Sequence, residues 1–182
     1  MTKRSAINTL TIDPLHTIVE YHVRHMGISN FRGKFGKVEG TIVLDEENPS
    51  NSSVKATIAA ASFDLPDGRF YRRISGQEFL DAEQYPWITF HSTSVEQADA
   101  DRWTVVGDLT LRGVTREVAL DTTYLGQEKD PFTARTVAAF SASGEIDRRD
   151  FGLNWNTPLE SGAAYLGEKV RLALQIETVR QD

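Results

Sequence analysis

The chain has 182 residues, 40% of them apolar and 25% charged, and its formal net charge is −6 at pH 7. This length and composition are typical of one globular domain with a substantial core. The acidic balance argues against nucleic acid and anionic membrane surfaces as partners, because both would repel the chain. The sequence contains no cysteine, which excludes disulfides, thiol nucleophiles and zinc sites built on thiolates.

Runs of apolar residues long enough for export or membrane insertion are not visible in the sequence. Residues 1–10 include two early cations but lack the apolar stretch of a signal peptide. No window approaches about 18 consecutive apolar residues, so we expect no membrane span. We therefore expect a cytoplasmic protein, or a secreted one if a leader has been removed from this sequence.

An alternation of apolar and polar residues with a period of two dominates the chain and indicates β-strands. In residues 17–26, one face of the first predicted strand carries Val19, Tyr21, Val23 and His25. Similar patterns predict seven further strands, at residues 38–45, 54–64, 87–95, 103–111, 114–124, 136–146 and 169–178. Residues 33–37 contain two glycines and indicate a bent strand with a glycine bulge rather than a phosphate-binding loop.

Two segments interrupt this alternation. Residues 67–83 carry Phe70, Ile74 and Phe79 at roughly helical spacing, which predicts a helical insertion over one mouth of the sheet, between the third and fourth strands. Residues 154–167 predict a loop with a short helix before the last strand.

Eight antiparallel strands joined by short hairpins favour an all-β closed barrel, with a sandwich as the alternative. Closure is favoured because it leaves no exposed edge strand. Strands of about 11 residues, tilted by about 40°, would enclose a tunnel roughly 28 Å long. Such a tunnel suits a slender chain of carbons better than a compact metabolite.

Catalytic and metal-binding motifs are absent from the sequence, which lacks the GxSxG, HExxH, P-loop and GxGxxG patterns. His22 and His25 lie three residues apart, so on a strand they point to opposite faces and cannot bind one metal ion. We therefore expect no metal site and no catalytic residue. The charged residues 147–150 are interpreted as a solvated turn.

The candidate binding residues fall into a lumen group and a rim group. The expected lumen residues are Val19, Tyr21, Val23, His25, Phe35, Phe90, Trp103, Phe140 and Phe151. His25 could instead be a core histidine hydrogen-bonded to a neighbour, and the aromatic residues could fill the core of any barrel. Arg69, Arg72 and Arg73 cluster in the helical insertion, where they form either a solvated helix face or a cationic rim for an anionic headgroup.

The order of motifs between residues 10 and 179 resembles that of the YceI-like family, also called polyisoprenoid-binding proteins. The most specific string is Gly107-Asp108-Leu109-Thr110-Leu111-Arg112-Gly113-Val114-Thr115. The other strings follow the family's order: Asp13-Pro14-Leu15-His16-Thr17, Tyr21-His22-Val23-Arg24-His25, Gly33-Lys34-Phe35, Ala61-Ser62-Phe63-Asp64, Ile88-Thr89-Phe90-His91-Ser92-Thr93, Asp150-Phe151-Gly152-Leu153 and Gly167-Glu168-Lys169-Val170. One element departs from the family's pattern, because Phe70-Tyr71-Arg72-Arg73-Ile74 stands in place of an Arg-Asp-x-His-Leu element. This departure predicts recognition of a different headgroup.

The resemblance implies a single domain, residues 1–182, folded as an eight-stranded antiparallel lipocalin-like barrel. It also implies a lumen that holds an amphiphilic chain, such as a polyprenyl pyrophosphate, a quinone tail or a fatty-acid derivative. On this interpretation the protein sequesters or transports a long-chain lipid, catalyses no reaction and needs no cofactor. Its oligomeric state stays open, with a homodimer as one option.

Two alternatives come from other functional classes. One is a barrel enzyme that uses His25 as an acid or base on a small apolar substrate, and the other is an interaction module whose lumen is filled by side chains. A long apolar tunnel favours the carrier, a short pocket with a polar end favours the enzyme, and a packed lumen favours the module.

Overall fold

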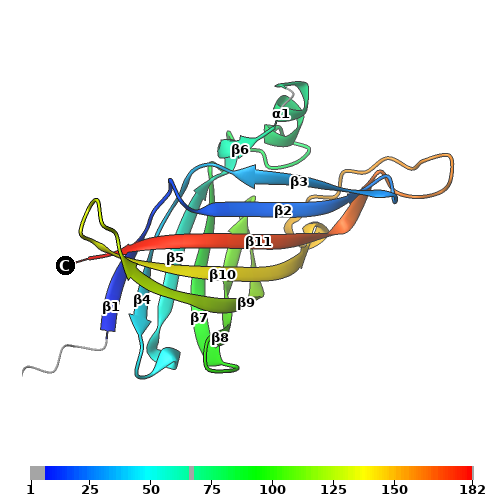
Figure 1. Ribbon diagram of the computed structural model, residues 1–182. Helices are drawn as coiled ribbons and strands as arrows, with labels where there is room; N and C mark the ends of the chain where they lie inside the picture. Colours follow the sequence, from blue (N-terminus) through cyan, green and yellow to red (C-terminus); the bar gives the residue numbers. More distant parts are fainter. Residues whose placement is uncertain (1–6, 66–67, 182) are drawn as a thin grey trace, which may run out of the picture.

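The β-strands join into one antiparallel sheet that curls round and closes on itself (Figure 1). The computed structural model describes residues 7–65 and 68–181, and within them it has eleven strands and one α-helix. The strands are β1 (Ile7–Ile12), β2 (Ile18–His25), β3 (Ser29–Phe35), β4 (Val38–Asp45), β5 (Ser53–Ala59), β6 (Phe63–Asp64), β7 (Trp87–Gln97), β8 (Arg102–Leu111), β9 (Val114–Lys129), β10 (Thr136–Asp147) and β11 (Leu166–Arg180).

Closure depends on β1, which pairs with β4 on one side and with β11 on the other. The resulting ring has eight strands in the order β1-β4-β5-β7-β8-β9-β10-β11. The predicted eight-stranded antiparallel barrel is therefore confirmed. The membership of the ring differs from the prediction, because β1 was not predicted as a strand.

The first predicted strand, β2, lies beside the ring rather than within it. The C-terminal end of the long strand β11 pairs with β1, at Leu10↔Arg180. An earlier part of β11 pairs with β2, at Val19↔Leu174. From β2 the sheet continues to β3 and then to the two-residue strand β6. β1 and β2 thus share one partner, and the β2–β3 hairpin extends the barrel wall at one end.

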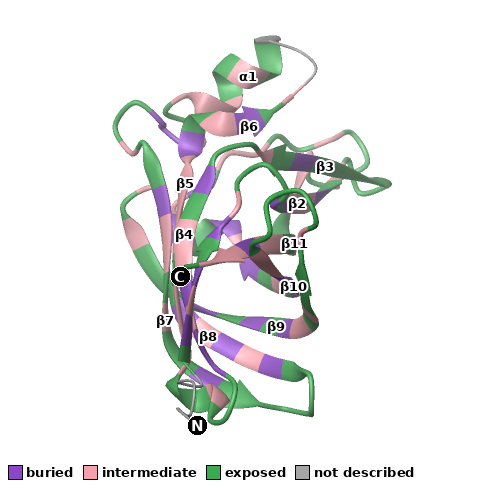
Figure 2. Ribbon diagram, turned by 60° about the vertical axis from the view of Figure 1, so that its left-hand side comes forward, coloured by how far each residue is buried: buried purple, intermediate pink, exposed green. Residues whose placement is uncertain are grey.

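The alternation of side chains directs one face of each ring strand into the barrel, as predicted. In β8, Trp103 and Val105 are buried whereas Arg102 and Asp108 are exposed. Gly107 lies on the inner face of the same strand, and a side chain there would collide with the ring of Phe90. In Figure 2, buried residues accordingly alternate with intermediate and exposed ones along the strands.

The predicted helical insertion is confirmed as α1 (Gly68–Ser75), which lies above one end of the barrel next to β6 (Figures 1 and 2). The ring of Tyr71 stacks on Phe63 at a centroid distance of 4.6 Å. The Tyr71 hydroxyl also donates a 2.8 Å hydrogen bond to the carbonyl oxygen of Ala61 in the 3-10 turn Ala60–Ser62. These contacts attach the helix to the end of the sheet, which we call the α1 end.

The segment before β11 is a loop, as predicted, but residues 154–165 lack the short helix that was expected within it; a 3-10 helix lies before the loop instead, at Arg148–Phe151. The side chain of Asn156 fixes the loop to the strand, since it donates to the carbonyl oxygen of Leu166 and accepts from the Leu166 amide. A further 3-10 turn, Pro49–Asn51, connects β4 to β5 at the opposite end. Among the described residues, no helix has the length and apolarity needed to cross a membrane.

Candidate functional site

The interior of the barrel contains a cavity of about 300 Å³ whose wall is almost entirely apolar. At the α1 end its wall includes Ile74, Phe79, Leu80 and Leu153. At the opposite end the wall includes Leu44, Ser52, Trp103 and Thr122. The cavity therefore extends along the barrel from one end to the other.

The structure places seven of the nine expected lumen residues at this wall. Val19, Tyr21 and Val23 lie on β2, and the others come from four different strands. Those four are Phe35 on β3, Phe90 on β7, Trp103 on β8 and Phe140 on β10. These seven residues therefore belong to the cavity wall, as predicted from the sequence.

His25 and Phe151 were expected in the lumen but are not part of the cavity wall. The pairing of β2 with β11 shifts register between Val23 and His25, where a bulge separates Val170 from Leu166. The His25 ring then packs edge-on against Tyr165 at a centroid distance of 4.8 Å. Phe151 follows the end of β10 in a 3-10 turn and is fully buried in the hydrophobic core.

Tyr21 and Gly33 form a matched pair on the inner face of the β2–β3 hairpin. The Tyr21 ring covers the position where a Gly33 side chain would lie, and it is flanked by Phe31 and Phe35 at centroid distances of 6.5 and 5.6 Å. The Tyr21 hydroxyl is buried and has no hydrogen-bond partner among the described residues. Burial raises the pKa of this phenol to about 12, so Tyr21 contributes a neutral ring to the wall.

An aromatic cluster lies at the end opposite α1, where Trp103 and Phe140 belong to the cavity wall and Tyr124 packs against them. Trp103 stacks on Tyr124 at a centroid distance of 6.0 Å, with ring planes 10° apart. Phe140 packs against both, at 6.4 Å from Trp103 and 5.3 Å from Tyr124. Trp103 is therefore a natural fluorescent reporter of whatever enters this end of the cavity.

Arg148 is the single charged side chain in the cavity wall among the described residues. Its guanidinium donates to four carbonyl oxygens around the loop before β11, those of Leu153, Trp155 (2.9 Å), Leu166 (3.4 Å) and Gly167 (2.8 Å). Burial lowers the pKa of this guanidinium, which nevertheless stays protonated because arginine titrates far above neutrality.

The burial of Arg148 corrects the expectation that residues 147–150 form a solvated turn. Arg149 and Asp150 are exposed as expected, but Arg148 is only 5% exposed. A run of four charged residues carries no pattern that separates the buried member from the others. Only the loop that folds back over β10, with carbonyl oxygens in need of donors, makes this burial favourable.

The three predicted rim arginines are exposed on α1, and none of them is part of the cavity wall. The guanidinium carbon of Arg73 lies 4.1 Å above the ring of Trp155, and its Nη2 lies 3.6 Å from Glu78 Oε2. Trp155 in turn contacts Phe79, a residue of the cavity wall, at a centroid distance of 5.3 Å. The arginine-bearing helix thus borders the α1 end of the cavity.

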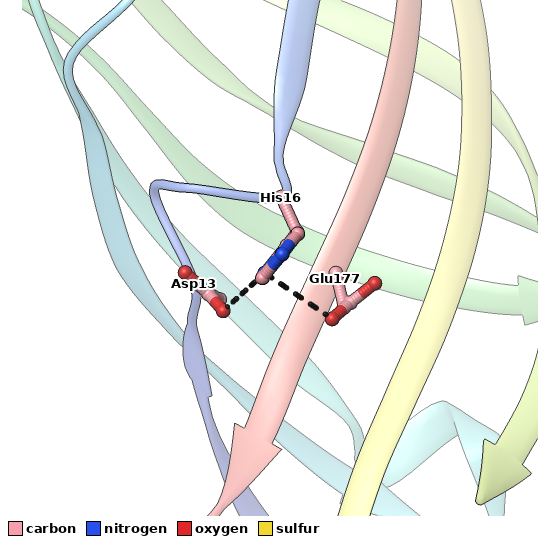
Figure 3. A group of neighbouring side chains, drawn as sticks. All are labelled: Asp13, His16 and Glu177. Atoms are coloured by element: carbon pink, nitrogen blue, oxygen red, sulfur yellow. Dashed lines mark hydrogen bonds and ion pairs between the residues drawn. The ribbon is translucent and has the colours of Figure 1, made fainter. Parts of the chain in front are cut away.

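A separate polar group lies on the outside of the barrel and was not predicted (Figure 3). Nδ1 of His16 is 2.8 Å from Asp13 Oδ2 and 3.6 Å from Glu177 Oε1, so the turn after β1 is joined to β11. The hydrogen bond between His16 and Asp13 raises the pKa of His16 and lowers that of Asp13. The three side chains could offer ligand atoms to a cation, yet the mutual hydrogen bond and ion pair already account for their arrangement.

Comparison with known proteins places the whole barrel in one family. Residues 10–178 match the profile of the YceI-like domain. Protein YceI of Escherichia coli O157:H7 is 36% identical over 166 residues, which cover 91% of this chain and 83% of that protein.

Two solved structures share the fold. BcnA of Burkholderia cenocepacia has a TM-score of 0.78 at 22% identity and covers 91% of this chain and 98% of its own. A polyisoprenoid-binding domain from Saccharophagus degradans has a TM-score of 0.65 at 12% identity and covers 98% of this chain and 100% of its own. At these identities the two structures show similarity of fold alone.

Proposed function

We propose, because this chain belongs to the YceI-like family, that its barrel binds a long-chain amphiphilic lipid and sequesters or transports it. A polyisoprenoid, a quinone tail or a fatty-acid derivative is the class of ligand. The observation that carries the proposal is the apolar cavity that extends from the α1 end of the barrel to the Trp103 end. The related fold of a polyisoprenoid-binding domain adds support.

The chemistry of the wall favours an apolar chain over a polar metabolite. Polar side chains are few there, and a sugar or nucleotide would lose hydrogen bonds to water that this wall does not replace. Each methylene buried against the wall contributes about 0.8 kcal/mol. A few isoprene units are therefore sufficient for micromolar affinity after the costs of association.

The headgroup belongs at the α1 end under this proposal. Burial of an unpaired phosphate or carboxylate among apolar side chains would be very costly. Arg148 is the cation inside the wall at that end, and Arg69, Arg72 and Arg73 lie on the helix that borders it. The Trp103 end of the wall has no charged side chain among the described residues, so it suits the tail.

The same geometry favours a carrier over an enzyme. Histidine, aspartate, glutamate and lysine do not occur among the described residues of the wall, so the cavity has no pair of acid and base. His25, the base of the alternative hypothesis, packs against Tyr165 instead of entering the cavity. An interaction module with a filled lumen is not supported either, because the lumen retains about 300 Å³ of space.

Native mass spectrometry of the purified protein, followed by solvent extraction and identification of the adduct, tests the proposal. We expect a fraction of the protein to carry a lipid of long-chain mass. Delipidated protein titrated with a polyprenyl phosphate should then show a saturable change in tryptophan fluorescence. No adduct and no saturable response to polyprenyl, quinone or fatty-acid ligands would refute lipid binding.

A further inference from the structure

The charges of this protein are segregated, although its net charge is −6. Residues 21–38, which include most of the β2–β3 hairpin, carry four lysines and arginines and no carboxylate, and the one carboxylate of the hairpin, Glu20, pairs in register with Lys34. The helix α1 carries three arginines and no carboxylate. We call the surface formed by these two segments the mouth surface; its cations are Arg24, Arg32, Lys34, Lys37, Arg69, Arg72 and Arg73.

These cations face solvent, and the carboxylates that lie near two of them, Lys34 and Arg73, face solvent as well. All seven are exposed. Nζ of Lys34 lies 3.7 Å from Oδ2 of Asp64, and Nη2 of Arg73 lies 3.6 Å from Oε2 of Glu78, but both carboxylates are themselves exposed. Ion pairs between exposed side chains contribute little and are readily exchanged for other anions. The two segments of the mouth surface therefore carry seven cations and no carboxylate, in contrast to the acidic chain as a whole.

Apolar side chains are exposed on the same surface. Ile28 at the tip of the β2–β3 hairpin is 79% exposed, and Phe70 on α1 is 51% exposed. Phe31 on β3 is 36% exposed and also belongs to the cavity wall, so the mouth surface adjoins an entrance to the cavity.

The sheet is also open beside Phe31. Among the described strands, β3 pairs with β2 along its length, but its other edge pairs with β6 only at Lys34 and Phe35. Residues 29–33 thus leave one edge without a strand partner within the described part of the chain. An unpaired strand edge, exposed apolar side chains and seven cations are therefore all found on the β2–β3 hairpin, the two residues after it and α1.

We propose that the mouth surface docks on an anionic lipid bilayer, with the cavity entrance toward the membrane. Each lysine or arginine near an anionic membrane contributes to binding, and aromatic and aliphatic side chains strengthen it by entering the interface. The acidic remainder of the protein is repelled by the same membrane, which orients the barrel. The purpose of docking, exchange of lipid with the bilayer, rests on the proposed function, but docking itself is measurable without a ligand.

A bilayer fits this surface better than an acidic protein does. The cations lie on two separate elements, a hairpin and a helix, and they are long flexible side chains interspersed with exposed apolar ones. A fluid layer of headgroups adapts to such a distribution, whereas a folded partner needs a complementary rigid surface of fixed shape.

Co-sedimentation with vesicles tests the proposal. One set of vesicles contains phosphatidylcholine alone, and the other also contains phosphatidylglycerol. The chain as given should bind the anionic vesicles and release them as salt is added, because screening weakens the attraction. The mouth variant R69Q/R72Q/R73Q should partition at least about tenfold more weakly, since each cation near such a surface is worth roughly fivefold.

The control variant R102Q/K129Q/R135Q removes the same charge elsewhere. Arg102 begins β8, Lys129 ends β9 and Arg135 directly precedes β10, so the three lie at the ends of these strands away from α1. For the apolar part, Phe70→Ser should weaken docking, whereas Phe132→Ser should not, although Phe132 in the β9–β10 loop is 96% exposed. Circular dichroism would verify that each variant is folded.

Equal partition of the mouth and control variants would overturn the proposal, as would equal binding to neutral and anionic vesicles. Fluorescence titration of the same proteins with a polyprenol in solution reports ligand binding separately. Docking without any ligand binding would refute the carrier function and retain the docking surface. Ligand binding without preference for anionic vesicles would refute the docking surface and retain the carrier function.

Discussion

A substitution that fills the cavity should separate stability from lipid binding. Ala142 on β10 is 4% exposed and its side chain is part of the cavity wall. The change Ala142→Leu adds about three methylene equivalents, which enter space that the lipid-free protein leaves empty, and at about 0.8 kcal/mol each they raise the free energy of unfolding by up to about 2 kcal/mol. For a domain of this size that gain corresponds to roughly 4–8 °C in the midpoint of thermal unfolding.

The matched control is Ala138→Leu on the same face of the same strand. Ala138 is 1% exposed but belongs to the packed core rather than to the cavity wall. Additional atoms there find no empty space, and overpacking of this kind costs about 1–3 kcal/mol. Urea or thermal unfolding of lipid-free protein should therefore give changes of opposite sign for the two variants.

Lipid binding supplies the second measurement. The leucine at position 142 occupies space that the chain of the ligand would fill, so the affinity of Ala142→Leu for a polyprenol should fall at least about tenfold. If both leucine variants lose stability alike, the space beside Ala142 is not empty and the reasoning from the cavity fails. If Ala142→Leu gains stability and keeps its affinity, the lipid binds elsewhere.

Three further predictions concern single features. Replacement of Arg69, Arg72 and Arg73 by glutamine should weaken binding of a polyprenyl phosphate in fluorescence titrations with little change for the matching alcohol, and equal affinities of variant and parent for the phosphate would eliminate the cationic rim. Tyr21→Phe should leave the free energy of unfolding in urea unchanged or higher, because the buried Tyr21 hydroxyl has no partner among the described residues and its removal loses no hydrogen bond; a clear loss of stability would show that this hydroxyl is bonded. His16 should stabilise the protein fully below its ordinary pKa of about 6.5, and this contribution should disappear as pH rises through the pKa that Asp13 raises. The free energies of unfolding of the parent and of His16→Gln, measured from about pH 5 to about pH 9, check this prediction. A difference between the two that does not change with pH would contradict it.

The fold could be predicted to the extent that strands alternate strictly. β7 to β11 each run for ten or more residues with apolar side chains directed inward, so pattern alone locates them. β1 has only six residues, and one of its buried positions is Asn8, whose amide donates a 3.0 Å hydrogen bond to Glu46. A short strand with a polar inward residue gives too little signal, although it is the strand that closes the ring.

Pairing partners were less accessible to prediction than the strands themselves. Alternation shows which face of a strand is inward, but not which of two candidates lies beside another strand. β11 is long enough to pair with β1 at Val179 and with β2 at Leu172. The choice depends on contacts between residues about 160 positions apart, which no local pattern encodes.

Cavity residues could be predicted where they lie on regular strands, because alternation shows which side chains face inward. Residues whose position depends on a bulge or a loop could not be predicted in this way. Val19, Phe90 and Trp103 reach the cavity because they lie on regular strands with the expected inward face. His25 fails because a bulge in the partner strand changes the register beside it. Arg148 was missed for a different reason, since its burial depends on carbonyl oxygens of a loop that folds over it only in the complete structure.

The cavity also connects ligand binding to the stability of the barrel. A space of about 300 Å³ between apolar side chains forgoes the packing contacts that a filled core would make there. Whole domains are stable by only about 5–15 kcal/mol, so a barrel with such a cavity gives up stability that a filled core would have. Under the proposed function a bound lipid returns part of it, since a ligand of the folded state at a hundred times its dissociation constant adds about 2.7 kcal/mol. A lumen that serves only as a core has no reason to retain this space, and that is the physical argument for a carrier.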